Sequence, residues 1–127
     1  MKSCSILVVD DESELRDVVA QVLQTAGHRV VQAGNGAEAT KLFAREHFDI
    51  VLTDVIMPEK DGMQVIAELR TKRPGVRIIA MSGGGHVPRD QYLKLASALG
   101  AHAALEKPFN NQALLAAVQK VLGPQAK

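Results

Sequence analysis

The chain has 127 residues, of which 46% are hydrophobic and 23% charged, a composition typical of one folded globular domain. Its 15 basic and 14 acidic residues leave a net charge of +1 without a basic tract, so nucleic acid is not expected as a partner. No apolar run approaches the roughly 20 residues that span a bilayer, and no signal-peptide pattern opens the chain. A single cysteine, Cys4, fits a reducing cytoplasm, so we expect a cytoplasmic protein without a membrane partner.

Short apolar runs alternate with segments of helical period along the whole chain. In chain order, we expect strands at 5–9, 29–33, 48–53, 77–81 and 101–105, and helices at 13–26, 35–46, 61–73, 88–99 and 110–122. Gly27 is a natural helix stop. Asn35 with Glu38 three residues later resembles a capping box, and Asn110 caps the last helix.

The regular alternation of strands and helices predicts a parallel sheet with helices on both faces. Five such units fit an open, doubly wound α/β sheet, because a closed eight-stranded barrel needs about 250 residues. We expect one domain over residues 1–123, followed by a short tail at 124–127. In such sheets ligands bind outside the carboxyl ends of the strands.

Charged and hydroxyl residues follow four of the expected strands at that edge. Asp10 and Asp11 follow the first strand, Asp54 the third, Ser82 the fourth and Lys107 the fifth. Clustered carboxylates repel one another, and a hard divalent cation such as Mg²⁺ relieves the repulsion. The alternative is that Asp10 and Asp11 only cap the first helix, with Asp11 and Glu14 forming a capping box.

Several motifs together resemble the response-regulator receiver domain of two-component signalling, in particular the single-domain, chemotaxis-regulator-like type. They are Leu7-Val8-Val9-Asp10-Asp11, Asp54-Val55-Ile56-Met57-Pro58-Glu59-Lys60-Asp61-Gly62, Met81-Ser82-Gly83-Gly84, Gly100-Ala101 and Glu106-Lys107-Pro108-Phe109. They span essentially the whole chain in family order and spacing. The resemblance implies a flavodoxin-like (βα)5 fold with strand order 2-1-3-4-5.

The resemblance also implies a role for each residue at the edge. Asp54 would be the phosphoacceptor, taking a phosphoryl group from a histidine kinase or a histidine phosphotransfer protein. Asp11, Asp54 and the backbone carbonyl of Ile56 would bind Mg²⁺ directly, and Asp10 through water. Lys107 and Ser82 would contact the phosphoryl oxygens, and the Lys107–Pro108 peptide bond would be cis.

The chain departs from the family pattern at Ala104, where receivers usually carry the Tyr or Phe that moves together with the Ser/Thr on phosphorylation. The Ser–aromatic switch therefore cannot operate in its usual form. The glycine-rich loop 83–86 is expected to move instead. The histidines His28, His47, His86 and His102 are expected at the surface, without a metal-binding spacing. Phe109 and the stripe of Leu114, Leu115 and Val118 are expected in the core.

The favoured function is a stand-alone switch or relay that acts through an unknown downstream protein, not a turnover enzyme. Two alternatives remain open: the receiver part of a longer regulator or hybrid kinase, and a degenerate receiver that binds partners without phosphorylation. A nucleotide or flavin binder is disfavoured because acidic residues, rather than a glycine-rich loop, follow the first strand. A phosphatase of the haloacid-dehalogenase type is disfavoured because its nucleophile belongs on that strand.

Overall fold

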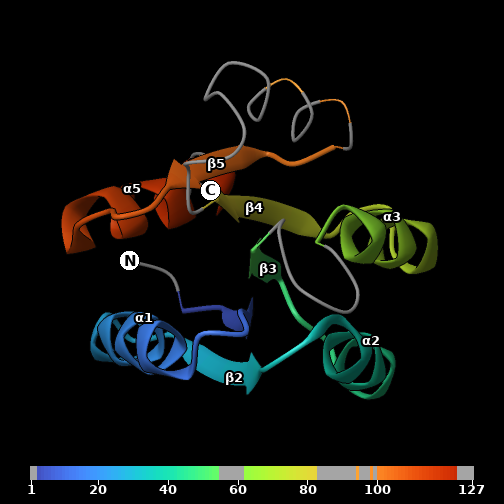
Figure 1. Ribbon diagram of the computed structural model, residues 1–127, viewed down its shortest axis with the longest axis horizontal. Coiled ribbons are helices and arrows are strands. Elements are labelled where there is room, and N and C mark those ends of the chain that lie inside the picture. The colour runs from blue at the N-terminus through green and yellow to red at the C-terminus, as the bar shows by residue number, and fades with distance from the viewer. Residues whose placement is uncertain (1–2, 55–61, 83–93, 95–97, 99, 123–127) are drawn as a thin grey trace.

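The computed structural model describes residues 3–54, 62–82, 94, 98 and 100–122. A five-stranded parallel sheet of order β2-β1-β3-β4-β5 forms its centre (Figure 1). This confirms the expected 2-1-3-4-5 order. The strands are β1 (Ser5–Val9), β2 (Arg29–Ala33), β3 (Ile50–Asp54), β4 (Arg77–Ser82) and β5 (Ala103–Glu106), and the helices are α1 (Ser13–Thr25), α2 (Gly36–Arg45), α3 (Gly62–Lys72) and α5 (Asn111–Leu122). The helix expected over 88–99 falls almost entirely outside the described residues.

Both faces of the sheet are covered, α1 and α5 on one side and α2 and α3 on the other (Figure 1). Successive residues of β1 point to opposite faces. Leu7 and Val9 belong to the core beneath α2 and α3, whereas Ile6 and Val8 belong to the core beneath α1 and α5. The unbroken apolar run of β1 is therefore needed to fill two cores at once.

Local capping signals explain where several helices begin and end. Gly27 has a φ of 100° just beyond α1, the left-handed conformation that favours glycine. The Asn35 side chain accepts a hydrogen bond from the Glu38 N–H at 2.8 Å, as predicted. The Glu38 carboxylate, however, accepts the Gly34 N–H rather than that of Asn35. Asn110 accepts the Ala113 N–H at 2.8 Å and caps α5.

The ends of three strands differ from the prediction because pairing, not hydrophobicity, sets the strand ends. β3 begins at Ile50 instead of Phe48 and includes Asp54, which lies opposite Met81. β4 extends to Ser82, and β5 begins at Ala103 and extends to Glu106, opposite Ser82. All three strands therefore reach further toward the carboxyl edge of the sheet than predicted.

The expectation that His28 lies at the surface is wrong. The residue is only 4% exposed, and its Nδ1 accepts the backbone N–H of Cys4 at 3.2 Å. Burial lowers the pKa of His28. His47 and His102 are exposed as predicted, whereas His86 lies outside the described residues. Within the described part of the chain, every helix is too short or too polar to cross a membrane.

Candidate functional site

Two buried carboxylates meet at the carboxyl edge of the sheet. Asp10 directly follows β1, and Asp54 is the last residue of β3. The register brings them together, because Val9 and Thr53 lie side by side in the neighbouring strands. Asp10 is 0% exposed and Asp54 is 5% exposed. Two carboxylates held this far from water require a nearby cation.

Lys107, which follows β5, supplies a cation to both carboxylates. Its Nζ lies 2.8 Å from Asp10 Oδ2, 2.9 Å from Asp54 Oδ2 and 3.1 Å from Glu12 Oε1. Burial alone would lower the pKa of Lys107, but the hydrogen bonds and negative charges of Asp10 and Asp54 outweigh it and raise that pKa. Lys107 is therefore positively charged at physiological pH. The Lys107–Pro108 peptide bond is cis, as the resemblance implied.

The carboxylates of Asp10, Glu12 and Asp54 form a compact cluster of oxygen ligands. One oxygen of each lies within 4.8 Å of the others. An all-oxygen donor set of this size suits Mg²⁺, a hard cation that binds through one or two carboxylates and retains several waters. The residues present therefore fit an acidic metal site of this kind.

Sequence reasoning missed Glu12 and singled out Asp11. Glu12 is the N-cap residue of α1, with an extended backbone at φ −86° and ψ 101°, and its side chain reaches the cluster. The Asp11 side chain is exposed, and its role as a direct metal ligand stays a prediction. The run of three acidic residues after β1 was the available signal for Glu12.

The capping alternative for this loop is wrong in its details. Glu12 rather than Asp11 occupies the N-cap of α1, and no side chain makes a cap hydrogen bond there. Asp11 and Glu14 therefore do not form a capping box. Asp10 Oδ1 instead accepts the Glu12 N–H at 2.9 Å, while its Oδ2 faces Lys107. Asp10 thus orders the loop and contributes to the charged cluster at once.

The remaining predicted site residues are placed only in part. Ile56 lies outside the described residues. Ser82 ends β4 with its backbone opposite Glu106, but its side chain is likewise outside the described part. Ala104 is half-buried and packs against the core beneath α2 and α3. No aromatic ring therefore stands at this position of β5.

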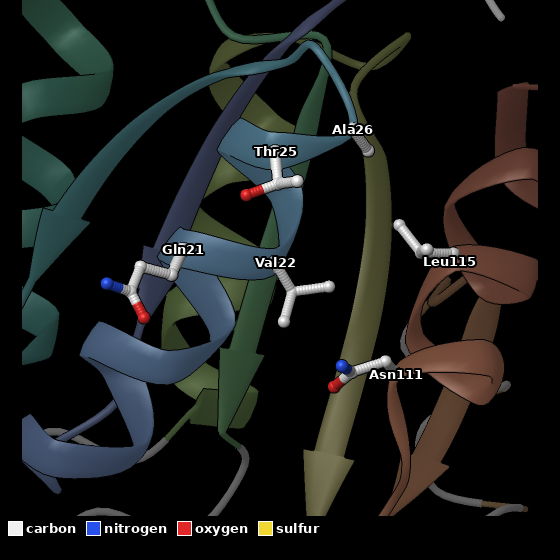
Figure 2. Close-up of a pocket in the computed structure, with 6 residues that line it drawn as sticks. All are labelled: Gln21, Val22, Thr25, Ala26, Asn111 and Leu115. Carbon is white, nitrogen blue, oxygen red and sulfur yellow. The ribbon is translucent and has the colours of Figure 1, made fainter.

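Two cavities lie near the helices that flank the site. One, of about 360 Å³, adjoins the carboxylate cluster and is lined by Glu12, Leu15, Lys107, Pro108 and Phe109. Phe109 is half-buried, and it also packs against the core as predicted. The other, of about 430 Å³, lies between α1 and α5 (Figure 2) and is lined by Gln21, Val22, Thr25, Ala26, Asn111 and Leu115. None of these six residues is charged, so the first cavity is the one adjoining the chemistry.

Known proteins share both the sequence pattern and the fold. Residues 6–119 match the family model described as the response regulator receiver domain. The DNA-binding transcriptional regulator NtrC of Azospirillum brasilense is 34% identical over 96% of this chain but only 25% of its own length. The chain spans between 25% and 49% of the length of the curated relatives DNA-binding transcriptional regulator NtrC, GlrR and ycf27, which it matches.

Several solved structures match this chain nearly end to end. The chemotaxis protein CheY4 of Vibrio cholerae is 30% identical, with a TM-score of 0.85 over 94% of this chain and 99% of that one. The response regulator TrrA of Thermotoga maritima, solved in complex with Mg²⁺-BeF, is 34% identical, with a TM-score of 0.81 over 93% and 98% of the two chains. The chain belongs to the response regulator receiver domain family of two-component signalling, whose members are signalling modules phosphorylated by histidine kinases.

Proposed function

We propose that this receiver accepts a phosphoryl group on Asp54 from a phosphohistidine of a histidine kinase or histidine phosphotransfer protein, in a Mg²⁺-dependent reaction. The observation that carries the proposal is the contact of Lys107 with both Asp10 and Asp54 at 2.8 and 2.9 Å. A buried carboxylate at a strand end, paired with a fixed cation and beside a second buried carboxylate, suits phosphoryl transfer better than it suits a structural ion pair.

In this proposal an Asp54 carboxylate oxygen attacks phosphorus in line with the leaving imidazole. The new O–P bond forms as the P–N bond of the phosphohistidine breaks, and the imidazole nitrogen recovers a proton from water. Lys107 stays protonated and holds a phosphoryl oxygen as a point charge. Ser82 donates its hydroxyl to another phosphoryl oxygen. Positioning and charge stabilisation supply most of the rate.

Asp11, Asp54 and the backbone carbonyl of Ile56 would hold Mg²⁺ directly, with Asp10 acting through water. When bound, Mg²⁺ supplies positive charge that offsets the negative phosphoryl oxygens. The acidic side chains around Asp54 support this assignment, because phosphate would otherwise be repelled from them. Glu12 faces the same cluster and adds to its negative charge.

The product is a phosphorylated domain, in which phosphate is added stoichiometrically and lost slowly rather than turned over. Because Ala104 replaces the usual aromatic residue, the response would depend on Ser82 and on the loop 83–86, which lies outside the described residues. The phosphorylated form then acts on an unknown downstream protein, as a stand-alone domain of residues 1–123 or as the receiver part of a longer regulator or hybrid kinase. The small side chain of Ala104 also favours a second candidate, a binding module that works without phosphorylation.

Intact-mass measurement after incubation with Mg²⁺ and acetyl phosphate tests the proposal. We expect one added phosphoryl group on the wild type, none on Asp54→Asn, and an unchanged adduct on the control Asp17→Asn, which alters an exposed carboxylate on α1. An adduct that persists on Asp54→Asn would place the acceptor elsewhere. Failure of the wild type with both acetyl phosphate and a cognate kinase would favour the binding module.

A further inference from the structure

The guanidinium of Arg16, on the first turns of α1, connects the loop after β1 to the edge strand β2. Its Nη1 donates to the backbone carbonyl of Asp10 at 2.7 Å, and its Nε donates to the side-chain oxygen of Gln32 at 3.0 Å. We call this pair of hydrogen bonds the Arg16 bridge. It is a feature of this chain that none of the roles discussed above requires.

The Asp10 carbonyl lies just beyond the paired part of β1. The β1–β2 ladder ends at Val9 and Ala33, and the Asp10 N–H still reaches the Ala33 carbonyl at 3.2 Å. The next carbonyl along the chain, that of Asp10, accepts the hydrogen bond from Arg16 Nη1. This hydrogen bond therefore fixes the peptide unit that joins Asp10 to Asp11, where the chain turns from strand to helix.

The guanidinium of Arg16 lies next to Gly34. A Cβ atom added to Gly34 would lie 3.4 Å from Arg16 Nη1 and 3.9 Å from its Cζ. These are ordinary van der Waals distances, so Gly34 lies directly beside the guanidinium and forms one side of its surroundings. Lysine could not reproduce the Arg16 bridge, because it lacks two donors held in one plane.

We propose that Arg16 is a positioning residue for the cation site: through the Asp10 carbonyl, it sets the direction in which Asp10, Asp11 and Glu12 present their carboxylates toward Asp54. This inference rests on the proposed function, in which these carboxylates serve Mg²⁺. Groups that orient metal ligands without touching the metal typically change affinity by about 10- to 100-fold when removed.

The positive charge of Arg16 and its hydrogen bonds predict opposite effects on the Mg²⁺ affinity. As a nearby cation, Arg16 repels Mg²⁺, so removing its charge alone should tighten binding. As a positioning residue, it aligns the ligands, so removing the Arg16 bridge should weaken binding. The sign of the change in Mg²⁺ affinity therefore separates the two roles. A change made at Gln32 tests the geometry while the charge on Arg16 stays in place.

Titration calorimetry with Mg²⁺ alone, on the full chain, tests the inference. We expect Arg16→Met to weaken Mg²⁺ binding about 10-fold, Arg16→Lys to recover only part of that loss, and Gln32→Leu to weaken binding to a smaller extent. The control Arg29→Met removes a cation at the opposite end of the sheet, where Arg29 lies beside Ser5, and should leave the affinity unchanged. Tighter or unchanged binding in Arg16→Met, with Gln32→Leu unchanged, would overturn the inference.

The rate of acetyl phosphate labelling supplies a second readout. In Arg16→Met the Mg²⁺ concentration for half-maximal rate should rise, whereas the rate at saturating Mg²⁺ should stay within about twofold of the wild type, because Asp54 and Lys107 are untouched. If Arg16→Met fails to fold, Gln32→Leu decides the question, since it removes one hydrogen bond of the Arg16 bridge and leaves Arg16 in place. Wild type that binds Mg²⁺ without becoming labelled would contradict the proposed function but not the Arg16 role. Wild type that binds no Mg²⁺ would overturn both.

Discussion

The two ends of the central sheet give their polar side chains different interaction partners. At the amino end, three side chains each accept a backbone N–H at or next to the start of a strand. His28 accepts that of Cys4 at 3.2 Å, Asp49 that of Ser5 at 2.8 Å, and His102 that of Ile78 at 3.1 Å. Each acceptor there has its own backbone donor. These side chains complete the hydrogen bonding of the strands, and their role is structural.

At the carboxyl end, several carboxylates gather around one shared cation, and Asp10 in addition accepts the Glu12 N–H at 2.9 Å. Asp10, Glu12 and Asp54 bring oxygens within 4.8 Å, and the ammonium of Lys107 contacts all three residues. Three carboxylates and one ammonium leave an excess of negative charge. A carboxylate therefore becomes available for chemistry where the fold gathers it with other carboxylates around a single cation.

The largest expected effect is the loss of the cation at the carboxyl end. Lys107→Met leaves the buried Asp10 and Asp54 without their shared positive charge, and should lower the free energy of unfolding by about 3 kcal/mol without Mg²⁺. Added Mg²⁺ should restore much of this loss. Urea unfolding with and without Mg²⁺ measures both, with the exposed Lys120→Met on α5 as the control. A loss below about 0.5 kcal/mol, the size of an ordinary surface substitution, would show that Lys107 does not stabilise the buried carboxylates of Asp10 and Asp54.

A smaller effect distinguishes the two acidic residues that follow Asp10. If Asp11 is a direct ligand, Asp11→Asn should weaken Mg²⁺ binding at least about 10-fold. Glu12→Gln should change the affinity by less than about fivefold, the factor that corresponds to 1 kcal/mol of surface charge interaction. Calorimetric titration of both variants measures the difference. The reverse order would make Glu12 the ligand and correct the assignment taken from the resemblance.

At the amino end, a change of charge should alter stability without altering chemistry. Asp49→Ala removes the acceptor of the Ser5 N–H and should cost about 1 kcal/mol of unfolding free energy, the usual value of one hydrogen bond. Labelling of Asp54 by acetyl phosphate should proceed at the wild-type rate. A slower rate in this variant would show that the two ends of the sheet are coupled.

The smallest effect concerns His28, whose pKa is lowered by burial from its ordinary value of 6.5. Because the folded state binds a proton less readily than the unfolded state, the stabilisation by neutral His28 is complete above this value. It declines as the pH falls from 6.5 toward the lowered pKa. His28→Asn keeps an acceptor for the Cys4 N–H but does not titrate. Between about pH 7 and about pH 5, we expect the free energy of unfolding in urea to fall more for the wild type than for this variant. The same fall in both proteins would refute the role of His28.

Local patterns predicted most of the elements because their causes are local. The caps at Asn35 and Asn110 and the stop at Gly27 depend on hydrogen bonds or backbone angles within a few residues. The buried strands were readable because both of their faces are apolar. The strand ends at Asp54 and Glu106 were not, since they are set by partners in neighbouring strands.

The errors involve side chains whose surroundings are assembled from distant segments. His28 is buried against Cys4, 24 residues away, and no sequence pattern near His28 predicts that contact. Glu12 reaches Lys107 across 95 positions of sequence. The Arg16 bridge spans 16 positions between Arg16 and Gln32. Such contacts follow from strand order and register rather than from any local motif.

The sequence by itself determined the alternation of strands and helices, and it determined which residues stand at the carboxyl ends of the strands. It did so because hydrophobic period and helix capping act over short stretches of chain. Only the tertiary structure decided that Lys107 joins Asp10 to Asp54, that Glu12 rather than Asp11 enters the described cluster, and that Arg16 holds the loop between them. The physical reason is that the parallel sheet brings distant strand ends to one edge, where charges interact through space rather than along the chain.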